Sequence, residues 1–522
     1  MASSAPIVLL LLALAAPALS IPHALRLASD GQSFLRPPSH TALTLLNNTS
    51  DDDVTEHYLA QPLDHFSSSA SSSSYEQRYF SRSTFSSSPT APDYVFLCTG
   101  GEGPAFQKSV LVDSVHCTGD MIALAEQLHS GGSDVLLMAL EHRFYGLSYP
   151  ASSSESSDDL PDMTFLTSQQ AVHDVGTFVE AMNDNFSTQP RWVTFGGSYP
   201  GMMSAWSRLL NPTLVHASVS SSSPVQAKLN MNEYNDWAGQ VLAQENIGGS
   251  AECQSMITEG HAAVAEMLAD PSLHASLVET FDVCAIDGLE DPLSVLRNQQ
   301  LFAGDGLLYI PAQGNDPSCT GELCDIASVC SSILSDPAET PLEALTRVVA
   351  VQNGGNCANV DWEANIKLLQ SPASKWGGTR SWLYQTCNEF GFYQTCDADS
   401  ECPYAKGYHP IDQDLEMCER VFGIKSDAVE QNVADSLDFY GGWNLNGTRI
   451  LFVNGDVDPW STLSVTPTNP DITVISEDLP AFWVEAASHH FWTHEVLDTD
   501  SQQVVDGREK IYAQVQDWLE ME

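Results

Sequence analysis

The most informative stretch of this sequence is residues 191–210, which read R-W-V-T-F-G-G-S-Y-P-G-M-M-S-A-W-S-R-L-L. Residues 192–195 are apolar and β-prone, two glycines and Ser198 follow, and apolar side chains then recur at helical spacing from Met202 to Leu210. The pattern predicts a strand, a tight turn and a helix. A serine on such a turn is held on strained backbone, with its hydroxyl exposed above the end of the strand. Ser198 is therefore the candidate nucleophile.

This turn resembles the nucleophile elbow of α/β-hydrolases, G-x-S-x-G, but Pro200 stands where the second glycine is usual and Gly201 comes one residue later. Proline in the first turn of a helix gives up no needed N–H group, so the change is tolerable. The alternative is a glycine-rich turn that opens an ordinary core helix. An acid and a histidine elsewhere in the chain, in the positions that a catalytic serine needs, would favour the first interpretation over the second.

Size and charge limit the kinds of protein that this chain can be. Its 522 residues exceed what one hydrophobic core usually holds, so we expect two domains or one domain with a large insertion. There are 68 acidic and 20 basic residues, a formal net charge of -48. Such a surface repels nucleic acid and anionic membranes, so neither is an expected partner. Protonation of carboxylates would relieve the repulsion, which suggests activity below neutral pH, although solubility is a simpler explanation.

The first residues have the pattern of a secretory leader. Residues 7–16 are almost all Leu, Val and Ala, and residues 18–20 form a small-x-small cleavage pattern, which predicts a signal peptide over residues 1–20. Residues 21–54 are polar and irregular, as in a loose terminal segment or a propeptide. No later stretch approaches about 20 apolar residues, so we expect no membrane anchor. Secretion, or delivery to a lysosome or vacuole, is the expected destination, and it fits glycosylation sequons at Asn47, Asn48, Asn185 and Asn446.

Cysteines are concentrated in the middle of the chain. Only Cys98 and Cys117 precede residue 250, and the other ten lie between Cys253 and Cys418. In a secreted protein, this distribution predicts a segment held together by disulfides, with a pairing that the sequence leaves open. Zinc is the alternative for the three cysteines at positions 319, 324 and 330, but their spacing lacks C-x-x-C pairs.

The first part of the chain predicts a sheet whose loops carry polar residues. Residues 57–66 and 75–80 alternate like the strands of a hairpin, with a serine-rich loop at 67–74. The buried run 94–97 leads into T-G-G-E-G-P at 99–104. Glycines after such a strand supply half of the oxyanion hole in α/β-hydrolases. We therefore expect the backbone N–H of Gly100 or Gly101, with Gly101 preferred, to act together with that of Tyr199.

Residues 134–140 form a nearly continuous apolar run, which predicts a strand of a parallel sheet that is buried on both faces. Glu141, His142 and Arg143 follow it. They could contact substrate, but we favour an internal ion pair that fixes the loop.

The alternation of strands and helices stops after the elbow region and returns near the end of the chain. A helix at 166–183 and a strand at 215–219 complete a first hydrolase part, residues 55–223. Residues 224–437 are mostly helical in pattern and predict an inserted cap. The second hydrolase part, residues 438–522, contains strands at 449–453 and 482–484 and closes with an amphipathic helix at 504–519.

An elbow serine needs an acid after a later strand and a histidine after the last one. I-L-F-V-N-G-D-V-D-P-W-S at 450–461 offers Asp456 and Asp458, and we favour Asp458 because Pro459 and Trp460 would stiffen its loop. A-A-S-H-H at 486–490 offers two histidines as the base: His489, which we favour, and His490. A metal site at His489, His490 and His494 is discounted because no carboxylate motif frames them, so we expect neither metal nor cofactor.

Further motifs extend a resemblance over residues 58–522. They are Q-P-L-D-H-F (61–66), Q-R-Y-F (77–80), G-G-E-G-P (100–104), E-H-R-F-Y-G (141–146), L-T-S-Q-Q-A (166–171), G-G-S-Y-P-G (196–201), S-S-P-V (222–225), Y-Q-T-C-N-E-F-G-F-Y-Q-T (384–395), N-G-D-V-D-P-W-S (454–461) and S-H-H (488–490). Together they resemble the proline-specific serine carboxypeptidase family, which includes lysosomal Pro-Xaa carboxypeptidase, dipeptidyl peptidase II and thymus-specific serine protease.

The resemblance implies an α/β-hydrolase fold with a large inserted, disulfide-rich helical cap and the catalytic residues Ser198, Asp458 and His489. It also implies that Met202, Trp460 and Phe392 line a pocket for proline, a ring that suits an apolar, aromatic slot. The sequence departs from the family at Pro200, at Asn388 where threonine is common, and in its serine-rich inserts near the N-terminus.

We therefore expect a serine exopeptidase that cleaves short peptides after proline or a similarly small residue. It would act either as a carboxypeptidase or as a dipeptidyl peptidase; Glu102 or Glu389, by binding a substrate amine, would favour the latter. A secreted lipase or carboxylesterase would use the same three residues. A non-catalytic binding protein on a hydrolase scaffold is the other alternative, and the sequence leaves open whether the chain is a monomer or a homodimer.

Overall fold

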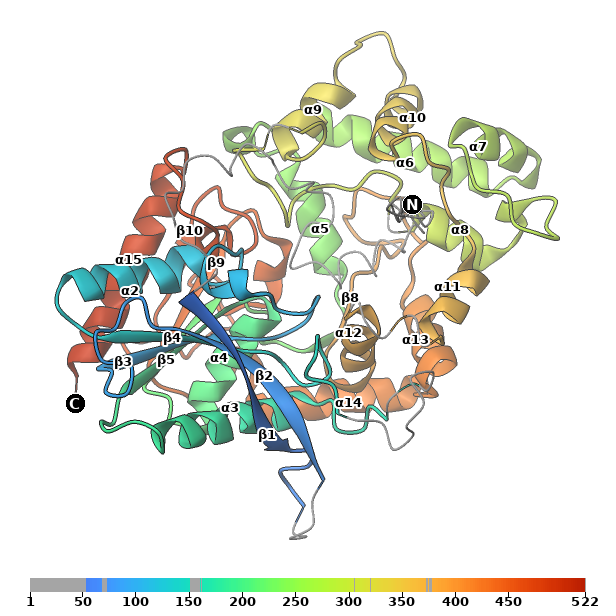
Figure 1. The fold of residues 1–522 in the computed structure, drawn as a ribbon. Coiled ribbons are helices and arrows are strands. Elements are labelled where there is room, and N and C mark those ends of the chain that lie inside the picture. Colours follow the sequence, from blue (N-terminus) through green and yellow to red (C-terminus); the bar gives the residue numbers. More distant parts are fainter. Residues whose placement is uncertain are drawn as a thin grey trace, which may run out of the picture.

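The computed structural model describes residues 53–67, 73–150, 160, 162–304, 306–319, 321–371, 374 and 378–521 (Figure 1). The predicted signal peptide, nearly all of the predicted N-terminal segment, the sequons at Asn47 and Asn48 and most of the serine-rich loop lie outside the described residues. The other two sequon asparagines, Asn185 and Asn446, are exposed, as glycosylation requires.

An eight-stranded sheet organises the parts of the chain before and after the cap. Its order is β1-β2-β4-β3-β5-β6-β9-β10, antiparallel at β1–β2 and β2–β4 and parallel elsewhere. The strands are β1 (Val54–Pro62), β2 (Ser74–Arg82), β3 (Tyr94–Thr99), β4 (Val135–Leu140), β5 (Arg191–Gly197), β6 (Ala217–Ser221), β9 (Ile450–Gly455) and β10 (Ala481–Val484). The hairpin and every other strand expected from the sequence are thereby confirmed.

Helices cover both faces of this sheet (Figure 1). Helices α2 (Ala123–Ser130) and α15 (Gln502–Glu520) pack on one face, and α3 (Ser168–Asn183) and α4 (Tyr199–Leu210) pack on the other. Side chains of β4 point alternately to the two faces of the sheet. Leu137 and Ala139 pack with α2 and α15, whereas Leu136, Met138 and Leu140 pack with α3 and α4. This two-sided burial explains the continuous apolar run, and the strand order with its elbow after β5 confirms the α/β-hydrolase fold.

The helical insertion between β6 and β9, predicted as residues 224–437, has a hydrophobic core built almost entirely from its own residues and joined by Val457, and its last helix runs on to Tyr440. Its helices are α5 (Asn232–Val241), α6 (Ala251–Leu268), α7 (His274–Thr280), α8 (Leu296–Ala303), α9 (Ile326–Ile333), α10 (Pro341–Gln352), α11 (Trp362–Leu369), α12 (Thr379–Gln385), α13 (Ile411–Phe422) and α14 (Ser426–Tyr440). A feature absent from the sequence-based expectation is the parallel pair β7 (Lys228–Asn230) and β8 (Gly391–Tyr393). No helix within the described part of the chain is both long and apolar enough to cross a membrane.

All twelve cysteines form disulfides, and five of the six bridges lie within the cap. The pairs are Cys98–Cys117, Cys253–Cys330, Cys284–Cys357, Cys319–Cys324, Cys387–Cys418 and Cys396–Cys402. The three cysteines considered as zinc ligands are therefore oxidised, which removes the thiolates that zinc would need. The expectation of a disulfide-rich cap is confirmed.

Buried ion pairs fix the loop after β4, but their partners lie on other elements. Arg143 Nε donates to Asp174 Oδ2 at 2.6 Å, and both side chains are at most 1% exposed. Tyr75 and His65 also bond the Asp174 carboxyl group. Glu141 receives a hydrogen bond from a buried arginine of β2 and others from backbone N–H groups of the loops after β3 and β4. These residues hold the loops together, as expected.

We expect Asp174→Asn to lower the free energy of unfolding by about 3–5 kcal/mol, because it leaves the Arg143 charge buried and uncompensated. Urea titration followed by circular dichroism measures this change. The matched control is Asp412→Asn, which breaks an ion pair with Arg297 at the surface and should cost less than about 1 kcal/mol. Equal losses in the two variants would contradict a structural role for the buried pair.

Candidate active site

The sequence-predicted site residues follow strands that end at the same edge of the sheet. Glu102 comes after β3, Ser198 after β5, Asp458 after β9 and His489 after β10, and these four strands are parallel. The carboxyl ends of parallel strands meet at one edge, where ligands of open α/β sheets bind. The fold therefore brings residues from very different parts of the chain to one place.

Ser198 occupies a strained position between β5 and α4, with φ 64° and ψ −134°. Its surroundings leave no space for side chains on the neighbouring glycines: a Cβ on Gly196 would lie 2.6 Å from Thr99 Oγ1, and one on Gly201 would lie 2.9 Å from the Gly196 carbonyl oxygen. Helix α4 thus crosses directly against the end of β5. This contact explains why the turn needs glycine on both sides of the serine.

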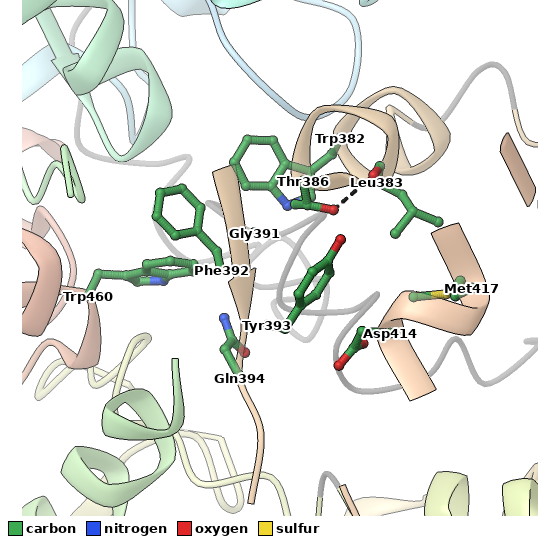
Figure 2. Close-up of a pocket in the computed structure, with 10 residues that line it drawn as sticks. All are labelled: Trp382, Leu383, Thr386, Gly391, Phe392, Tyr393, Gln394, Asp414, Met417 and Trp460. Carbon is green, nitrogen blue, oxygen red and sulfur yellow. Dashed lines mark hydrogen bonds between the residues drawn. The ribbon is translucent and has the colours of Figure 1, made fainter. Parts of the chain in front are cut away.

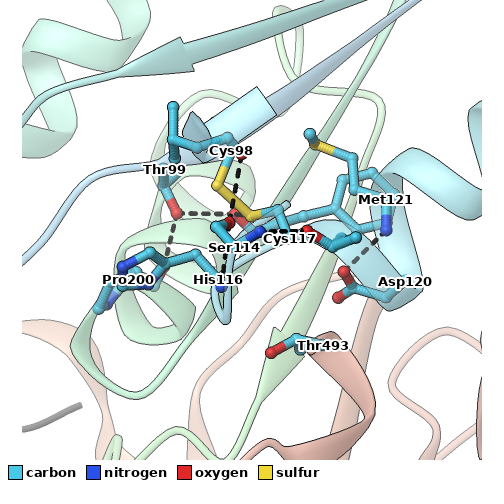
Figure 3. Close-up of a disulfide and its surroundings, with 12 residues drawn as sticks. Cys98, Thr99, Ser114, His116, Cys117, Asp120, Met121, Pro200 and Thr493 are labelled. Atoms are coloured by element: carbon cyan, nitrogen blue, oxygen red, sulfur yellow. Dashed lines mark hydrogen bonds between the residues drawn. A yellow bond between two sulfur atoms is a disulfide. The ribbon is translucent and has the colours of Figure 1, made fainter. Parts of the chain in front are cut away.

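Pro200 fits this geometry as the second residue of α4. Its carbonyl accepts a hydrogen bond from Thr99 Oγ1 at 2.7 Å, beside the Cys98–Cys117 disulfide (Figure 3). Its ring packs on Gly101, where a Cβ would come within 2.5 Å of Pro200 Cδ. The proline therefore joins the turn to the loop that carries Gly101. As at every helix start, the first N–H groups of α4, including that of Tyr199, have no partner within the helix.

Asp458 and His489 form a buried hydrogen-bonded pair. Nδ1 of the imidazole lies 2.7 Å from Asp458 Oδ2, and the exposed fractions of the two side chains are 3% for His489 and 0% for Asp458. The other carboxylate oxygen, Oδ1, accepts the backbone N–H of Trp460 at 3.0 Å. His489 Nε2 is buried and has no hydrogen-bond partner among the described residues. The carboxylate thus orients the ring and leaves Nε2 available for a proton.

The alternatives Asp456 and His490 have different surroundings. His490 lies beside His489, with ring centroids 4.6 Å apart, but its Nδ1 pairs with Thr493 Oγ1 at 3.1 Å. A Cβ on Gly197 would lie 2.6 Å from the His490 ring, so this ring packs directly under the elbow. Burial lowers the pKa of His490 well below its usual value, and burial raises the pKa of Asp456. The structure pairs Asp458 with His489 instead.

The two glutamates considered as amine ligands differ in their availability. The Glu389 carboxylate is enclosed and accepts hydrogen bonds from the backbone N–H and the hydroxyl of Ser168 at 2.9 and 2.7 Å. Burial raises the pKa of Glu389 to about 7. Burial also raises the pKa of Glu102 to about 7, against smaller lowering effects of its own backbone N–H and of a hydrogen bond with the Ser198 side chain. Of the two, Glu102 is the one that follows β3 at the sheet edge where Ser198 lies.

A pocket between the cap and the hydrolase part contains two of the three residues expected to hold proline (Figure 2). Phe392 and Trp460 lie edge to face, with ring centroids 5.5 Å apart, and Trp382 stands beside them. The remaining lining residues are Leu383, Thr386, Gly391, Tyr393, Gln394, Asp414 and Met417. Met202 is fully buried in the cluster that packs α4 onto the sheet, and it is not among these residues.

Gln313, in a cap loop, is a site residue that sequence reasoning missed. Its side-chain oxygen accepts hydrogen bonds from Tyr234 OH at 2.8 Å and from Trp460 Nε1 at 3.0 Å. Its backbone oxygen accepts the N–H of His489 at 3.1 Å. The cap thereby positions both the histidine and the pocket wall. No motif marks this residue, because its partners come from distant parts of the chain.

A strained serine at an elbow and a histidine–aspartate pair at the carboxyl edge of a mainly parallel sheet define the α/β-hydrolase class. The model of the family described as serine carboxypeptidase S28 matches residues 61–511, so the chain belongs to this family of serine peptidases. Thymus-specific serine protease of Mus musculus is 36% identical over 88% of this chain and 87% of its own length. Lysosomal Pro-X carboxypeptidase of Homo sapiens is 25% identical, covering 88% of each chain.

Among solved structures, a serine hydrolase from Cycloclasticus zankles matches 90% of this chain and 100% of its own, with 11% identity and a TM-score of 0.35. The family match, and not this structural similarity, shows that the chain is an enzyme of the serine peptidase type. It thereby decides against the two alternatives considered above, a lipase or carboxylesterase and a non-catalytic binding protein.

We expect Gly196→Ala to lower the rate of fluorophosphonate labelling by about 100-fold, because displacing α4 moves Ser198 by a fraction of an ångström or more. Labelling kinetics on the purified variant measure the loss. Gly321→Ala is the control, since its Cβ would meet the nearest atom, Cys324 Sγ, at an ordinary 3.4 Å. Labelling of Gly196→Ala within about two-fold of the unchanged protein would show that the tight crossing is dispensable.

Proposed function

We propose that this serine peptidase is an exopeptidase that cleaves short peptides after proline or a similarly small residue. The observation that carries the proposal is the buried hydrogen bond between His489 Nδ1 and Asp458 Oδ2, at the same sheet edge as the strained Ser198. Such a pair is what turns an elbow hydroxyl into a nucleophile.

In the proposed reaction, Ser198 Oγ attacks the carbonyl carbon of the peptide bond while His489 Nε2 takes its proton. Asp458 holds the imidazole in the tautomer with hydrogen on Nδ1 and stabilises the imidazolium. The N–H groups of Tyr199 and Gly101 would stabilise the oxyanion. His489 then gives the proton to the leaving amine, and water releases the acyl group from Ser198 by the same steps in reverse order.

The aromatic pocket supports specificity for proline. The Trp460 ring lies 6.3 Å from the His489 ring, so the pocket begins next to the proposed base. An apolar slot formed by Trp460 and Phe392 suits the proline ring, which has no N–H to satisfy. The human relative's printed name, lysosomal Pro-X carboxypeptidase, points to the same substrate class.

The cap supports action on chain ends. Its residues Gln313 and Tyr234 contact the loops that carry His489 and Trp460, so the site lies beneath it and a long folded substrate has little access. Six disulfides require an oxidising compartment, and relatives carry the word lysosomal in their names. We propose the secretory pathway, with a lysosome-like lumen or the exterior as the destination.

Ser198→Ala, His489→Ala and Asp458→Asn should each lower kcat by about 10³-fold or more, because the three groups act as a unit. Release of a chromophore from a proline-containing peptide measures kcat. Asp456→Asn is the matched control, since this neighbouring carboxylate does not bond His489, and it should keep most of the activity. A large loss in Asp456→Asn with a small one in Asp458→Asn would overturn the assignment of the acid.

Product analysis should separate the two modes of cleavage. A peptide library with proline at varied positions, read by mass spectrometry, should give cuts only one residue from the C-terminus or two residues from the N-terminus. Parallel sets with an amidated C-terminus or an acetylated N-terminus show which end is recognised, because blocking that end abolishes cleavage. Cuts in the interior of long peptides would contradict an exopeptidase.

A further inference from the structure

Tyr199, the residue after the elbow serine, belongs to a chain of hydrogen bonds between buried side chains. Its hydroxyl lies 2.9 Å from His142 Nε2 and accepts a hydrogen bond from Gln385 Nε2 at 2.8 Å. The side-chain oxygen of Gln385 accepts a further hydrogen bond from Tyr145 OH at 2.6 Å. Each of the four residues is at most 4% exposed. The chain of bonds connects the cap helix α12, the start of α4 and the loop after β4.

The hydrogen bonds of this chain run in one direction. His142 Nδ1 lies 2.6 Å from the Arg143 carbonyl oxygen, which only accepts, so Nδ1 carries the hydrogen. Burial lowers the pKa of His142 to about 4, so the ring is neutral near pH 7 and Nε2 is an acceptor. The Tyr199 hydroxyl therefore donates to Nε2 and receives the amide N–H of Gln385 on its oxygen. This arrangement pairs the phenol on both sides and holds it in one position.

The Tyr199 ring is also enclosed by aromatic side chains of the cap. Its centroid lies 5.5 Å from that of Trp382 and 5.4 Å from that of Phe390. Trp382 precedes Gln385 by three residues on α12, so this helix contacts both the ring and the hydroxyl of Tyr199. Trp382 also lines the aromatic pocket beside Phe392 (Figure 2). One cap helix therefore supplies a wall of the pocket and an anchor for Tyr199.

The backbone N–H of Tyr199 is a proposed oxyanion donor, and the first turn of α4 sets its direction. The Ser198 carbonyl oxygen of the same peptide group accepts the N–H of Met202 at 3.0 Å, which fixes this peptide group relative to the helix. The start of the helix must itself be held in place, because Ser198 has strained backbone that persists only when its surroundings hold it. The Tyr199 side chain, bonded at its hydroxyl from two sides, supplies such a hold.

His142 also supports the loop that carries the second proposed donor. A Cβ on Gly100 would lie 2.6 Å from the His142 backbone nitrogen, so the loop after β3 packs directly on this residue. The next residue, Gly101, packs on the Pro200 ring in the first turn of α4. His142 thus contacts the Gly101 loop through its backbone and Tyr199 through its ring. The spacing of the two proposed N–H donors therefore depends on the groups that hold Tyr199 against His142.

We propose that Gln385 of the cap and His142 of the loop after β4 are positioning residues that hold Tyr199, and with it the oxyanion hole, in its working geometry. This inference rests on the proposed roles of Ser198 and of the Tyr199 N–H. Both side chains act through the Tyr199 hydroxyl and not on the substrate itself. An oxyanion hole stabilises charge only when its donors point at the place that the oxyanion will occupy. The cap thereby contributes to the chemical step as well as to access.

Loss of this hold should weaken binding of the transition state and leave binding of the substrate unchanged. The oxyanion forms only as the serine attacks, so displaced donors lower kcat with little change in KM. Removal of a whole oxyanion donor costs about 10²–10³-fold in kcat, and a donor that is displaced but still present should cost about 30-fold. A residue that only stabilised the fold would leave the kcat of the folded enzyme unchanged.

The test compares Gln385→Met and Tyr199→Phe, which remove the two partners of one hydrogen bond and nearly keep the shapes of the side chains. Each should lower kcat for a chromogenic proline peptide by about 30-fold, with KM within about two-fold. The double variant should lose about as much as Tyr199→Phe alone, because both changes break the same link.

Tyr440→Phe is the matched control. It removes another buried tyrosine hydroxyl, which lies at the end of α14 and pairs with Ser168 Oγ at 2.9 Å at the start of α3. This bond also joins a helix of the insertion to the hydrolase part, but it does not reach Tyr199. The variant should therefore keep kcat within about two-fold of the unchanged protein.

Two inhibitors separate the oxyanion hole from the pocket. With a proline-containing trifluoromethyl ketone, Ser198 Oγ adds to the ketone carbon, the serine proton passes to His489, and the ketone oxygen takes the negative charge. Its affinity should fall about as much as kcat does. A reduced-bond analogue, with CH₂ in place of the scissile carbonyl, has no oxygen for the hole and should bind each variant within about two-fold of the unchanged protein. Thermal melts show whether each variant is folded.

A folded Gln385→Met variant with unchanged kcat and unchanged affinity for the ketone would overturn the inference. Equal losses of affinity for the ketone and for the reduced-bond analogue would also overturn it, because they would indicate a distorted pocket. If Gln385→Met does not fold, Tyr199→Phe decides by the same criteria.

Failure of the proposed function has a different signature. If the unchanged protein cleaves no proline peptide, the proposed specificity is wrong. The rate of Ser198 inactivation by a fluorophosphonate, whose phosphoryl oxygen enters the same hole, then replaces kcat in the comparison of Gln385→Met with the unchanged protein. A protein that neither cleaves peptides nor reacts with the fluorophosphonate would refute the proposed catalytic role of Ser198, and with it this inference.

Discussion

Helix α4 can pack against the end of β5 only because Gly196 and Gly201 have no side chains, and the rest of the site depends on this contact. It forces Ser198 into a backbone conformation that non-glycine residues seldom adopt, and it brings the Pro200 ring onto Gly101. The strain raises the serine above the sheet edge, and the Gly101 contact places the Glu102 loop beside it. The proposed nucleophile, the oxyanion-hole candidates and the Glu102 loop are thereby positioned by one packing constraint.

The second half of the site is held from the cap. Gln313 binds the Trp460 indole through its side chain and the His489 backbone through its carbonyl oxygen, so the proposed base and the pocket wall share one anchor. Five disulfides lie within the cap and give its loops a covalent frame. The cap is therefore a structural part of the proposed catalytic site as well as a cover over it.

The net charge of the chain and the ionisation of its individual buried carboxyl groups are separate properties of this protein. The large negative net charge is a property of the whole sequence, whereas Glu102 and Glu389 are individual carboxyl groups whose pKa values burial raises to about 7. Elsewhere a buried carboxylate stays charged because a cation neutralises it: the Arg143 guanidinium holds the pKa of Asp174 below its usual value in spite of burial. The contrast shows that the partner, and not burial alone, sets whether an interior acid is ionised.

Much of this architecture is encoded locally. The strand–turn–helix around Ser198, the buried parallel strand β4 and the order of serine, aspartate and histidine along the chain follow from residue periodicity and turn chemistry, which act over a few neighbouring residues. The pairing of cysteines, the buried hydrogen bond that joins the favoured Asp458 to the favoured His489, and the anchoring by Gln313 do not follow from such patterns. They depend on which side chains meet across hundreds of residues, and only packing in the folded chain specifies that.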